Sequence, residues 1–155
     1  MLLKLMNTQN EYSLALARVL LGVVFFAHGA QKMFGWFGGS GFSGTISDFT
    51  KFGMPIVVAL FAIFVELLGG LSLLFGLLSR VAALGIIVEM IGAVLTIHIH
   101  IGFFMNWLGD QKGEGFEYHL IAIALAFLIM VRGAGAPSID YMVFSRNFRG
   151  NKERQ

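Results

Sequence analysis

Ionisable side chains interrupt the long apolar stretches of this sequence, and their types suggest chemistry. They are Arg18, His28, Lys32, Glu66, Glu89, His98, His100, Glu117 and His119. A charge inside a membrane span is costly and usually faces the interior of a helix bundle or a water-filled cavity. Neutral imidazoles can ligate a metal or bond to a quinone carbonyl, and a buried carboxylate can relay protons. These residue types therefore predict a metal, quinone or proton site.

Helical spacing decides between these alternatives. His28 and Lys32 are four residues apart and share one face of a helix, and Glu89 and His100 also lie on one face. His98 and His100 are two residues apart, so one of them must turn away, and this spacing makes a poor metal pair on a helix. We therefore predict no metal site, and nothing specifies a haem. Quinone or proton handling fits the pattern better.

Glu66 is the most informative of these residues, because it lies near the middle of its apolar stretch. An unpaired carboxylate is expensive there, so it must stay neutral or find a partner. A rise of about 1.5 Å per residue puts His28 at a similar depth and Arg18 level with Glu89 nearer the inner boundary. We expect any catalytic role to fall to Glu66 and His28. Four small residues lie on the same helix face as Glu66 and should bring it to the bundle centre. They are Ala59, Ala62, Gly69 and Gly70.

Simpler explanations exist for the other ionisable side chains. Arg18, close to a helix end, can snorkel to the lipid headgroups. Lys32, Glu117 and His119 lie near the outer boundary of their spans and can simply be solvated. His98 can be a structural residue that faces away from the others.

The apolar stretches themselves require a membrane. Hydrophobic residues make up 57% and charged residues 13% of the chain, with a mean hydropathy of +0.78. Soluble domains have about 45–50% hydrophobic and about 25% charged residues. About 20 residues cross a bilayer, and four stretches satisfy this, at about 13–34, 55–78, 81–105 and 116–133. We predict an all-α polytopic membrane protein, with a four-transmembrane-helix bundle over 1–137 and a basic cytoplasmic tail at 138–155.

Basic residues predict the orientation, because they gather on the cytoplasmic side. The termini and the turn between the second and third spans hold Lys4, Arg80, Arg132, Arg146, Arg149, Lys152 and Arg154, whereas the opposite side holds Lys32, Lys51 and Lys112. Both termini are therefore predicted to be cytoplasmic. The glycine- and aromatic-rich stretch 35–53 is predicted to be a loop in the membrane interface. The basic residues form no groove for nucleic acid, and the lack of cysteine excludes thiol redox chemistry.

Several short blocks carry a family resemblance. They are AHGAQKMFG at 27–35, ELLGG at 66–70, GLLSRVAA at 76–83, HIGFF at 100–104, the Glu117-Tyr118 pair, and GAG at 133–135 followed by Ser138-Ile139-Asp140. In this order and spacing the chain resembles the DoxX family of small four-helix membrane proteins along nearly its whole length. Two departures are Ala134, where the family often has proline, and Glu89, where a neutral residue is expected.

The resemblance implies a connection with quinones, since relatives are linked to an archaeal terminal quinol oxidase and look like the membrane subunit of thiosulfate:quinone oxidoreductase. It puts Arg18, His28, Lys32, Glu66, Arg80, His100, Glu117 and Asp140 on the family's motif positions. We expect His28, Lys32, Glu66, His100 and Glu117 to line a quinone-accessible or proton-conducting pocket in the outer half of the plasma (inner) membrane.

Three functions stay open at this point. The chain is a redox-associated subunit that binds quinone, a non-catalytic assembly or scaffold subunit for a partner redox enzyme, or a small transporter or proton channel. Its expected partners are membrane lipids and a redox enzyme subunit, and not nucleic acid. A transporter would have to be a homo-oligomer, because four spans leave little room for alternating access.

Overall fold

The computed structural model describes residues 2–152, and the side chains of residues 4–145 within them. Its elements are α1 (Leu2–Leu5), α2 (Tyr12–Phe34), η1 (Trp36–Gly38), α3 (Gly41–Lys51), α4 (Ile56–Phe64), η2 (Val65–Gly69, a π-helical turn), α5 (Gly70–Phe75), α6 (Ser79–Thr96), η3 (His98–His100), α7 (Glu117–Arg132) and α8 (Ile139–Lys152). In the described part of the chain every regular element is a helix, which confirms the predicted all-α class.

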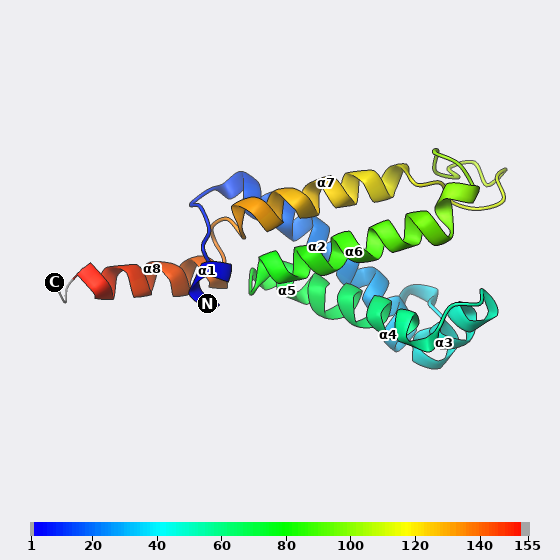
Figure 1. Ribbon diagram of the computed structural model, residues 1–155, viewed down its shortest axis with the longest axis horizontal. Coiled ribbons are helices and arrows are strands. Elements are labelled where there is room, and N and C mark those ends of the chain that lie inside the picture. Colours follow the sequence, from blue (N-terminus) through cyan, green and yellow to red (C-terminus); the bar gives the residue numbers. More distant parts are fainter. Residues whose placement is uncertain (1, 153–155) are drawn as a thin grey trace.

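The long helices pack into an elongated bundle (Figure 1). α2 contacts α5, η2 and α7, while α6 contacts α7 on one side and η2 and α5 on the other. α2, α6 and the continuous rod of α4, η2 and α5 are each long and apolar enough to cross a membrane. α7 has 16 residues, or about 24 Å at 1.5 Å per residue, and packs along α6 as the fourth candidate span.

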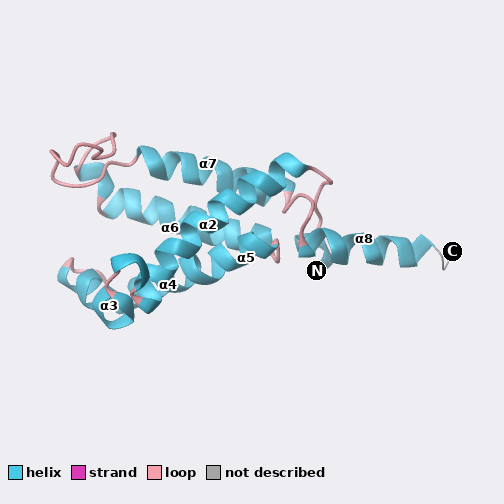
Figure 2. Ribbon diagram, turned by 180° about the vertical axis from the view of Figure 1, so that it is seen from behind, coloured by secondary structure: helices cyan, strands magenta, loops and turns pink. Residues whose placement is uncertain are grey.

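The connections between these helices lie at the two ends of the bundle (Figure 2). α1 and α8 lie at one end, called here the α8 end (Figure 1). α3 and the loop after α6 lie at the opposite end, called here the α3 end (Figure 1). The first and last described helices of the chain are therefore on the same side of the bundle.

Small residues allow α2 and the second span to touch through their backbones. The predicted small-residue face is buried, and comprises Ala59, Ala62, Glu66, Gly69 and Gly70. A Cβ added at Gly70 would fall on the backbone of Phe26, and one added at Gly29 would fall on the backbone of Leu67. Close approach of this kind is typical of helix packing in membranes. It holds η2 against the C-terminal half of α2, which also carries Lys32.

The third span is shorter than predicted. α6 ends at Thr96, whereas the apolar stretch was expected to continue as one helix to Met105. Backbone hydrogen bonds fold the following loop onto the start of α7, since Phe116 N–H donates to the Gly102 carbonyl at 3.1 Å and Glu117 N–H donates to the Phe103 carbonyl at 2.9 Å. Gly102 has a φ of +133°, which a helix cannot contain. Residues 97–116 therefore form a folded loop rather than the end of a span.

Two segments are more helical than predicted. The stretch 35–53 was expected to be a loop, and it contains the eleven-residue helix α3. The predicted tail at 138–155 contains α8, and Arg154 lies outside the described residues. Trp36, Phe37 and Phe52 around α3 are 51%, 72% and 72% exposed, as expected for side chains in a membrane interface.

Arg18 closes the α8 end of the bundle instead of pairing with Glu89 or reaching the headgroups. Its side chain is only 2% exposed. Nε donates to the Ala134 carbonyl at 2.8 Å and Nη2 to the Pro137 carbonyl at 2.8 Å, while Nη1 donates to Leu73 and Leu74 at the end of α5. The guanidinium therefore joins α2, α5 and the segment before α8, which the depth estimate could not reveal.

Asp140 has a similar structural role at the N-terminus of α6. Its carboxylate is 1% exposed and accepts hydrogen bonds from the backbone N–H groups of Leu78 at 2.8 Å and Ser79 at 3.0 Å. These groups lie at the N-terminus of α6, where a negative charge is favourable. The carboxylate thereby ties the start of α8 to the start of α6.

Candidate functional site

A cavity of about 390 Å³ opens among the helices at the α3 end. Phe25 of α2, Phe49 of α3 and Met90 of α6 supply apolar wall. Its ionisable and phenolic side chains are His28, Lys32, Glu66, Glu89, His98, Glu114, Tyr118 and His119. Each of the four long helical segments of the bundle therefore contributes at least one polar group to the same cavity.

An ion pair lies in the wall of this cavity. Lys32 Nζ donates to Glu66 Oε2 at 2.5 Å, and the two side chains are 24% and 7% exposed. Glu66 lies on η2, and such single π-helical turns occur frequently at functional sites. Thr45 of α3 donates to the Lys32 carbonyl at 3.2 Å, which fastens α3 over the end of α2. The mid-membrane carboxylate thus has the partner that its depth required.

Three buried polar atoms of the cavity lining have no hydrogen-bond partner among the described residues. They are Glu89 Oε2, the Tyr118 hydroxyl and His119 Nδ1. Glu89 lies close enough to Glu66 and Lys32 to interact with both electrostatically, and Tyr118 interacts in the same way with both carboxyls. Buried polar atoms are normally satisfied, so these three mark the part of the cavity that is suited to a polar ligand.

Two neighbouring imidazoles, tilted by 44° to each other, form another part of the wall. The ring centroids of His98 and His119 are 4.1 Å apart, and His98 Nδ1 lies 2.7 Å from the Glu114 carbonyl oxygen. His98 belongs to the loop end of the cavity, whereas His119 is 6% exposed on α7. Over the described part of the chain, no group of three or more His, Cys, Asp or Glu side chains is placed to hold a metal ion.

The predicted pocket residues divide into two groups. His28, Lys32 and Glu66 all line the cavity. His100 does not, because it is exposed on η3 after the end of α6. Glu117 lies at the start of α7 and accepts hydrogen bonds from Met105 N–H at 3.1 Å and Trp107 Nε1–H at 3.2 Å, facing a neighbouring pocket. The structure thus brings three of the five predicted residues together in this cavity and places His100 and Glu117 outside its lining.

Five further polar residues of the cavity, Glu89, His98, Glu114, Tyr118 and His119, were not assigned to it from the sequence. Glu89 was placed level with Arg18, while a structural role was weighed for His98 and simple solvation for His119. Tyr118 was noted only for the family resemblance. Its position beside His119, at the start of an apolar stretch, is the sequence signal that could have drawn attention to it.

Comparison with known proteins identifies the family. The DoxX family model matches residues 13–99. The chain is 30% identical to "Putative oxidoreductase CatD" of Bacillus subtilis over 146 residues, which cover 94% of this chain and 98% of CatD. It is 27% identical to the inner membrane protein YqjF of Escherichia coli over 89% of this chain and 97% of YqjF. It is also 27% identical to the inner membrane protein YphA of the same organism, over 82% of this chain and 87% of YphA. No solved structure matches the chain.

The spans and the relatives agree on the location of the protein. The protein has helices of membrane-crossing length and is similar to two inner membrane proteins. It is therefore a multi-pass protein of the inner membrane. Since the family model covers more than half of the sequence and CatD aligns over nearly all of both chains, this protein belongs to the DoxX family.

Proposed function

We propose that this protein binds the ring of a quinone in the cavity at the α3 end and exchanges protons with it, as the membrane subunit of a quinone-linked oxidoreductase. The observation that carries the proposal is the presence of three buried polar atoms without partners, among the described residues, around one cavity. A quinone has two carbonyl oxygens that accept hydrogen bonds and two apolar faces. Both features match the lining of this cavity.

The size and chemistry of the cavity support a ring-sized ligand. A volume of about 390 Å³ lies at the small end of the range of roughly 300–1,000 Å³ for small-molecule sites. The Tyr118 hydroxyl can donate to one carbonyl oxygen and a ring nitrogen of His119 can serve the other. Phe25 and Met90 offer apolar contact to the faces of the ring.

The carboxyl cluster provides the proton chemistry. Reduction of a quinone to a quinol consumes two electrons and two protons. Glu66 and Glu89 share the single ammonium of Lys32, and an uncompensated buried charge is costly, so this cluster favours one bound proton. One quinone oxygen receives this proton, and the second proton comes from water. The electrons come from a reduced flavin or metal centre of a partner oxidoreductase. The name of the relative CatD, which describes an oxidoreductase, is in line with such a role.

Replacing Tyr118 with phenylalanine tests the ring-binding role directly. Loss of one hydrogen bond of about 0.5–1.5 kcal/mol should weaken binding of ubiquinone-1 by roughly two- to tenfold. The dissociation constant can be measured by titrating the purified detergent-solubilised protein. Tyr12→Phe is the matched control, because Tyr12 is 76% exposed and lies outside the cavity lining, and this variant should bind as the wild type does.

Wild-type protein that binds neither ubiquinone-1 nor a menaquinone analogue would refute the proposal. Mass spectrometry of molecules that co-purify from native membranes gives an independent measurement. Recovery of a defined redox enzyme without any quinone, together with unaltered complex formation by Tyr118→Phe, would support the alternative of an assembly subunit.

The proposal includes an orientation in which both termini face the cytoplasm and the cavity opens toward the outer side. Because the chain has no cysteine, single cysteines at the exposed positions Lys4 and Lys112 would each report one side of the membrane. In intact cells, a membrane-impermeant maleimide should label Lys112→Cys and should label Lys4→Cys only after permeabilisation. The reverse pattern would put the cavity on the cytoplasmic side.

A further inference from the structure

A second pocket, of about 490 Å³, adjoins the proposed quinone cavity. Met105 and Tyr118 line both spaces, so one wall is common to the two. The remaining lining of the second pocket is mostly apolar and comes from the loop after α6 and the first two turns of α7, with Phe103, Trp107, Leu120 and Ile121. We call it the side pocket.

The side pocket faces outward from the bundle. Leu120, Ile121 and Trp107 are 47%, 63% and 83% exposed. In a chain of this kind, large apolar side chains exposed at the end of a span contact lipid rather than water. The side pocket therefore offers apolar surface from the bilayer up to the Tyr118 ring.

Glu117 does not make the side pocket polar. Its carboxylate accepts hydrogen bonds from the loop, one from the Met105 backbone N–H and one from the Trp107 indole N–H. The carboxylate thus fastens the loop to the start of α7 and fixes the rim of the side pocket. Glu117, a predicted site residue, therefore has a structural role next to the cavity and does not line it.

A different neighbour of the cavity is unsuitable for hydrocarbon. A pocket of about 230 Å³ shares Lys32 and Phe49 with the cavity, but its lining includes Gln31, Ser40 and Asp48. Hydrogen bonds from Lys51 and Ser40 lower the pKa of the Asp48 carboxyl, so it carries a charge at neutral pH. An apolar chain would have to displace water from that charge, which is costly.

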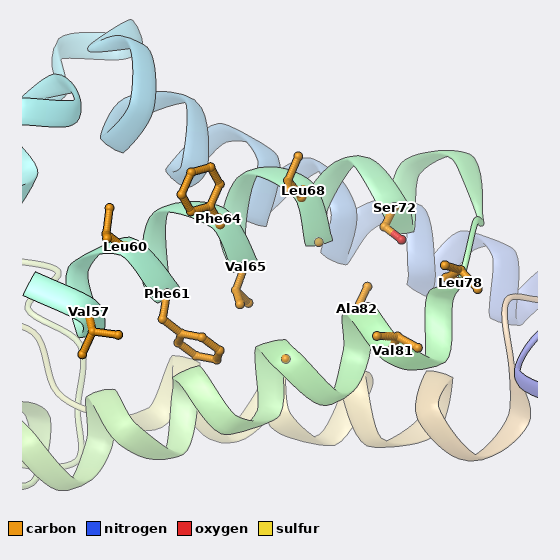
Figure 3. Close-up of a pocket in the computed structure, with 12 residues that line it drawn as sticks. Val57, Leu60, Phe61, Phe64, Val65, Leu68, Ser72, Leu78, Val81 and Ala82 are labelled. Atoms are coloured by element: carbon orange, nitrogen blue, oxygen red, sulfur yellow. The ribbon is translucent and has the colours of Figure 1, made fainter.

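A larger apolar space is a groove of about 700 Å³ between the second span and α6 (Figure 3). Val57, Phe61 and Val81 are among the residues that line it, and Figure 3 shows them on the two facing helices. None of its lining residues also lines the cavity. The groove therefore lacks the shared wall that the side pocket has.

From this comparison we infer that the side pocket receives the prenyl tail of the quinone whose ring occupies the cavity, and that the quinone passes from the bilayer between Met105 and Tyr118. This inference rests on the function proposed above. It adds that the substrate is a tailed, membrane-dissolved quinone that arrives sideways from the lipid, with Leu120 and Ile121 beside its first prenyl units.

The experiment compares two quinones on two matched variants. Ubiquinone-0 has the ring without a prenyl tail, whereas ubiquinone-2 carries two prenyl units. Ile121→Trp fills the side pocket, and Val57→Trp is its control because Val57 is 68% exposed and lines the separate groove. Overpacking by Ile121→Trp should raise the dissociation constant of ubiquinone-2 by about tenfold or more and change that of ubiquinone-0 by no more than about twofold. Val57→Trp should leave both dissociation constants unchanged.

The outcomes separate this inference from the proposed function. If wild-type protein binds neither quinone, the proposed function fails. If it binds both and Ile121→Trp affects them equally or not at all, or if only Val57→Trp weakens ubiquinone-2, the tail lies elsewhere. Photolabelling of wild-type protein by a ubiquinone with a diazirine on its tail avoids any folding defect of the variants. The label should fall on the peptide that contains Leu120 and Ile121, and a label on residues 57–64 would overturn the assignment.

Discussion

Lys32→Met should destabilise the bundle more than any single change to its carboxyl partners. Among the described residues, Lys32 is the only lysine or arginine in the cavity lining, and its removal leaves the Glu66 carboxylate beside Glu89 without its counter-charge. Breaking a buried ion pair from one side costs about 3–5 kcal/mol. Glu66→Gln should cost less, because Glu89 still lies near the Lys32 ammonium.

Thermal unfolding in detergent measures this order of stabilities. The double variant Lys32→Met/Glu66→Gln should recover part of the loss seen in Lys32→Met, since it removes the carboxylate that has lost its cation. Lys51→Met is the control, because the Lys51–Asp48 pair has side chains that are 71% and 47% exposed, and such surface pairs contribute about 0–1 kcal/mol. A double variant that is less stable than Lys32→Met would contradict the description of the cluster as two carboxyls sharing one cation.

The part of the site that could be predicted is the part carried by uninterrupted helix. His28 and Lys32 are four residues apart on α2, which is helical as far as Phe34, so the spacing rule held and both line the cavity. The depth of Glu66 required a partner, and Lys32 supplies it. Apolar length and composition likewise predicted the spans at the level of whole helices.

Some of the predictions that differ from the structure concern residues beyond the C-terminus of α6. The face shared by Glu89 and His100 assumed that α6 continues through residue 100, but it stops at Thr96. The three residues after Ile97 form a 3₁₀ turn, which rotates side chains differently from an α-helix. His98 consequently meets His119, while His100 is left exposed. The hydrogen bonds that fold the following loop onto α7, from Phe116 to Gly102 and from Glu117 to Phe103, join residues fourteen positions apart, and no local sequence pattern predicts them.

Arg18 illustrates a second limit, since depth along a span does not reveal which backbone groups lie beside a side chain. Level matching suggested Glu89 as its partner, but the guanidinium instead binds carbonyls from two distant segments. One of these segments, 133–138, follows α7 and is brought to α2 by the closure of the whole bundle. The planar guanidinium has five N–H donors and can therefore bind several carbonyls at once. The sequence alone does not indicate that these carbonyls lie beside Arg18.

Replacing Arg18 with methionine should therefore unfold the α8 end of the bundle. The carbonyls of Ala134, Pro137 and Leu74 would lose the Arg18 donor, while the Leu73 carbonyl keeps its bond from Gly76 N–H. Each unsatisfied buried group costs about 1–3 kcal/mol. We expect a loss of about 3 kcal/mol or more, from about 1 kcal/mol or more for each of the three carbonyls left without this donor.

Two further variants separate the carbonyl contacts of Arg18 from its charge. Arg18→Lys keeps the charge but presents a compact ammonium that cannot span four carbonyls, so its stability should fall between those of wild type and Arg18→Met. Arg132→Met is the exposed control, since Arg132 is 43% exposed and bonds to Gln9 and Glu11, and it should cost about 1 kcal/mol or less. Thermal midpoints give the order, and hydrogen exchange of residues 133–140 reports whether the loss begins there. Equal effects of Arg18→Met and Arg132→Met would show that the guanidinium does not hold the α8 end together, and would leave Asp140 as its main fastening.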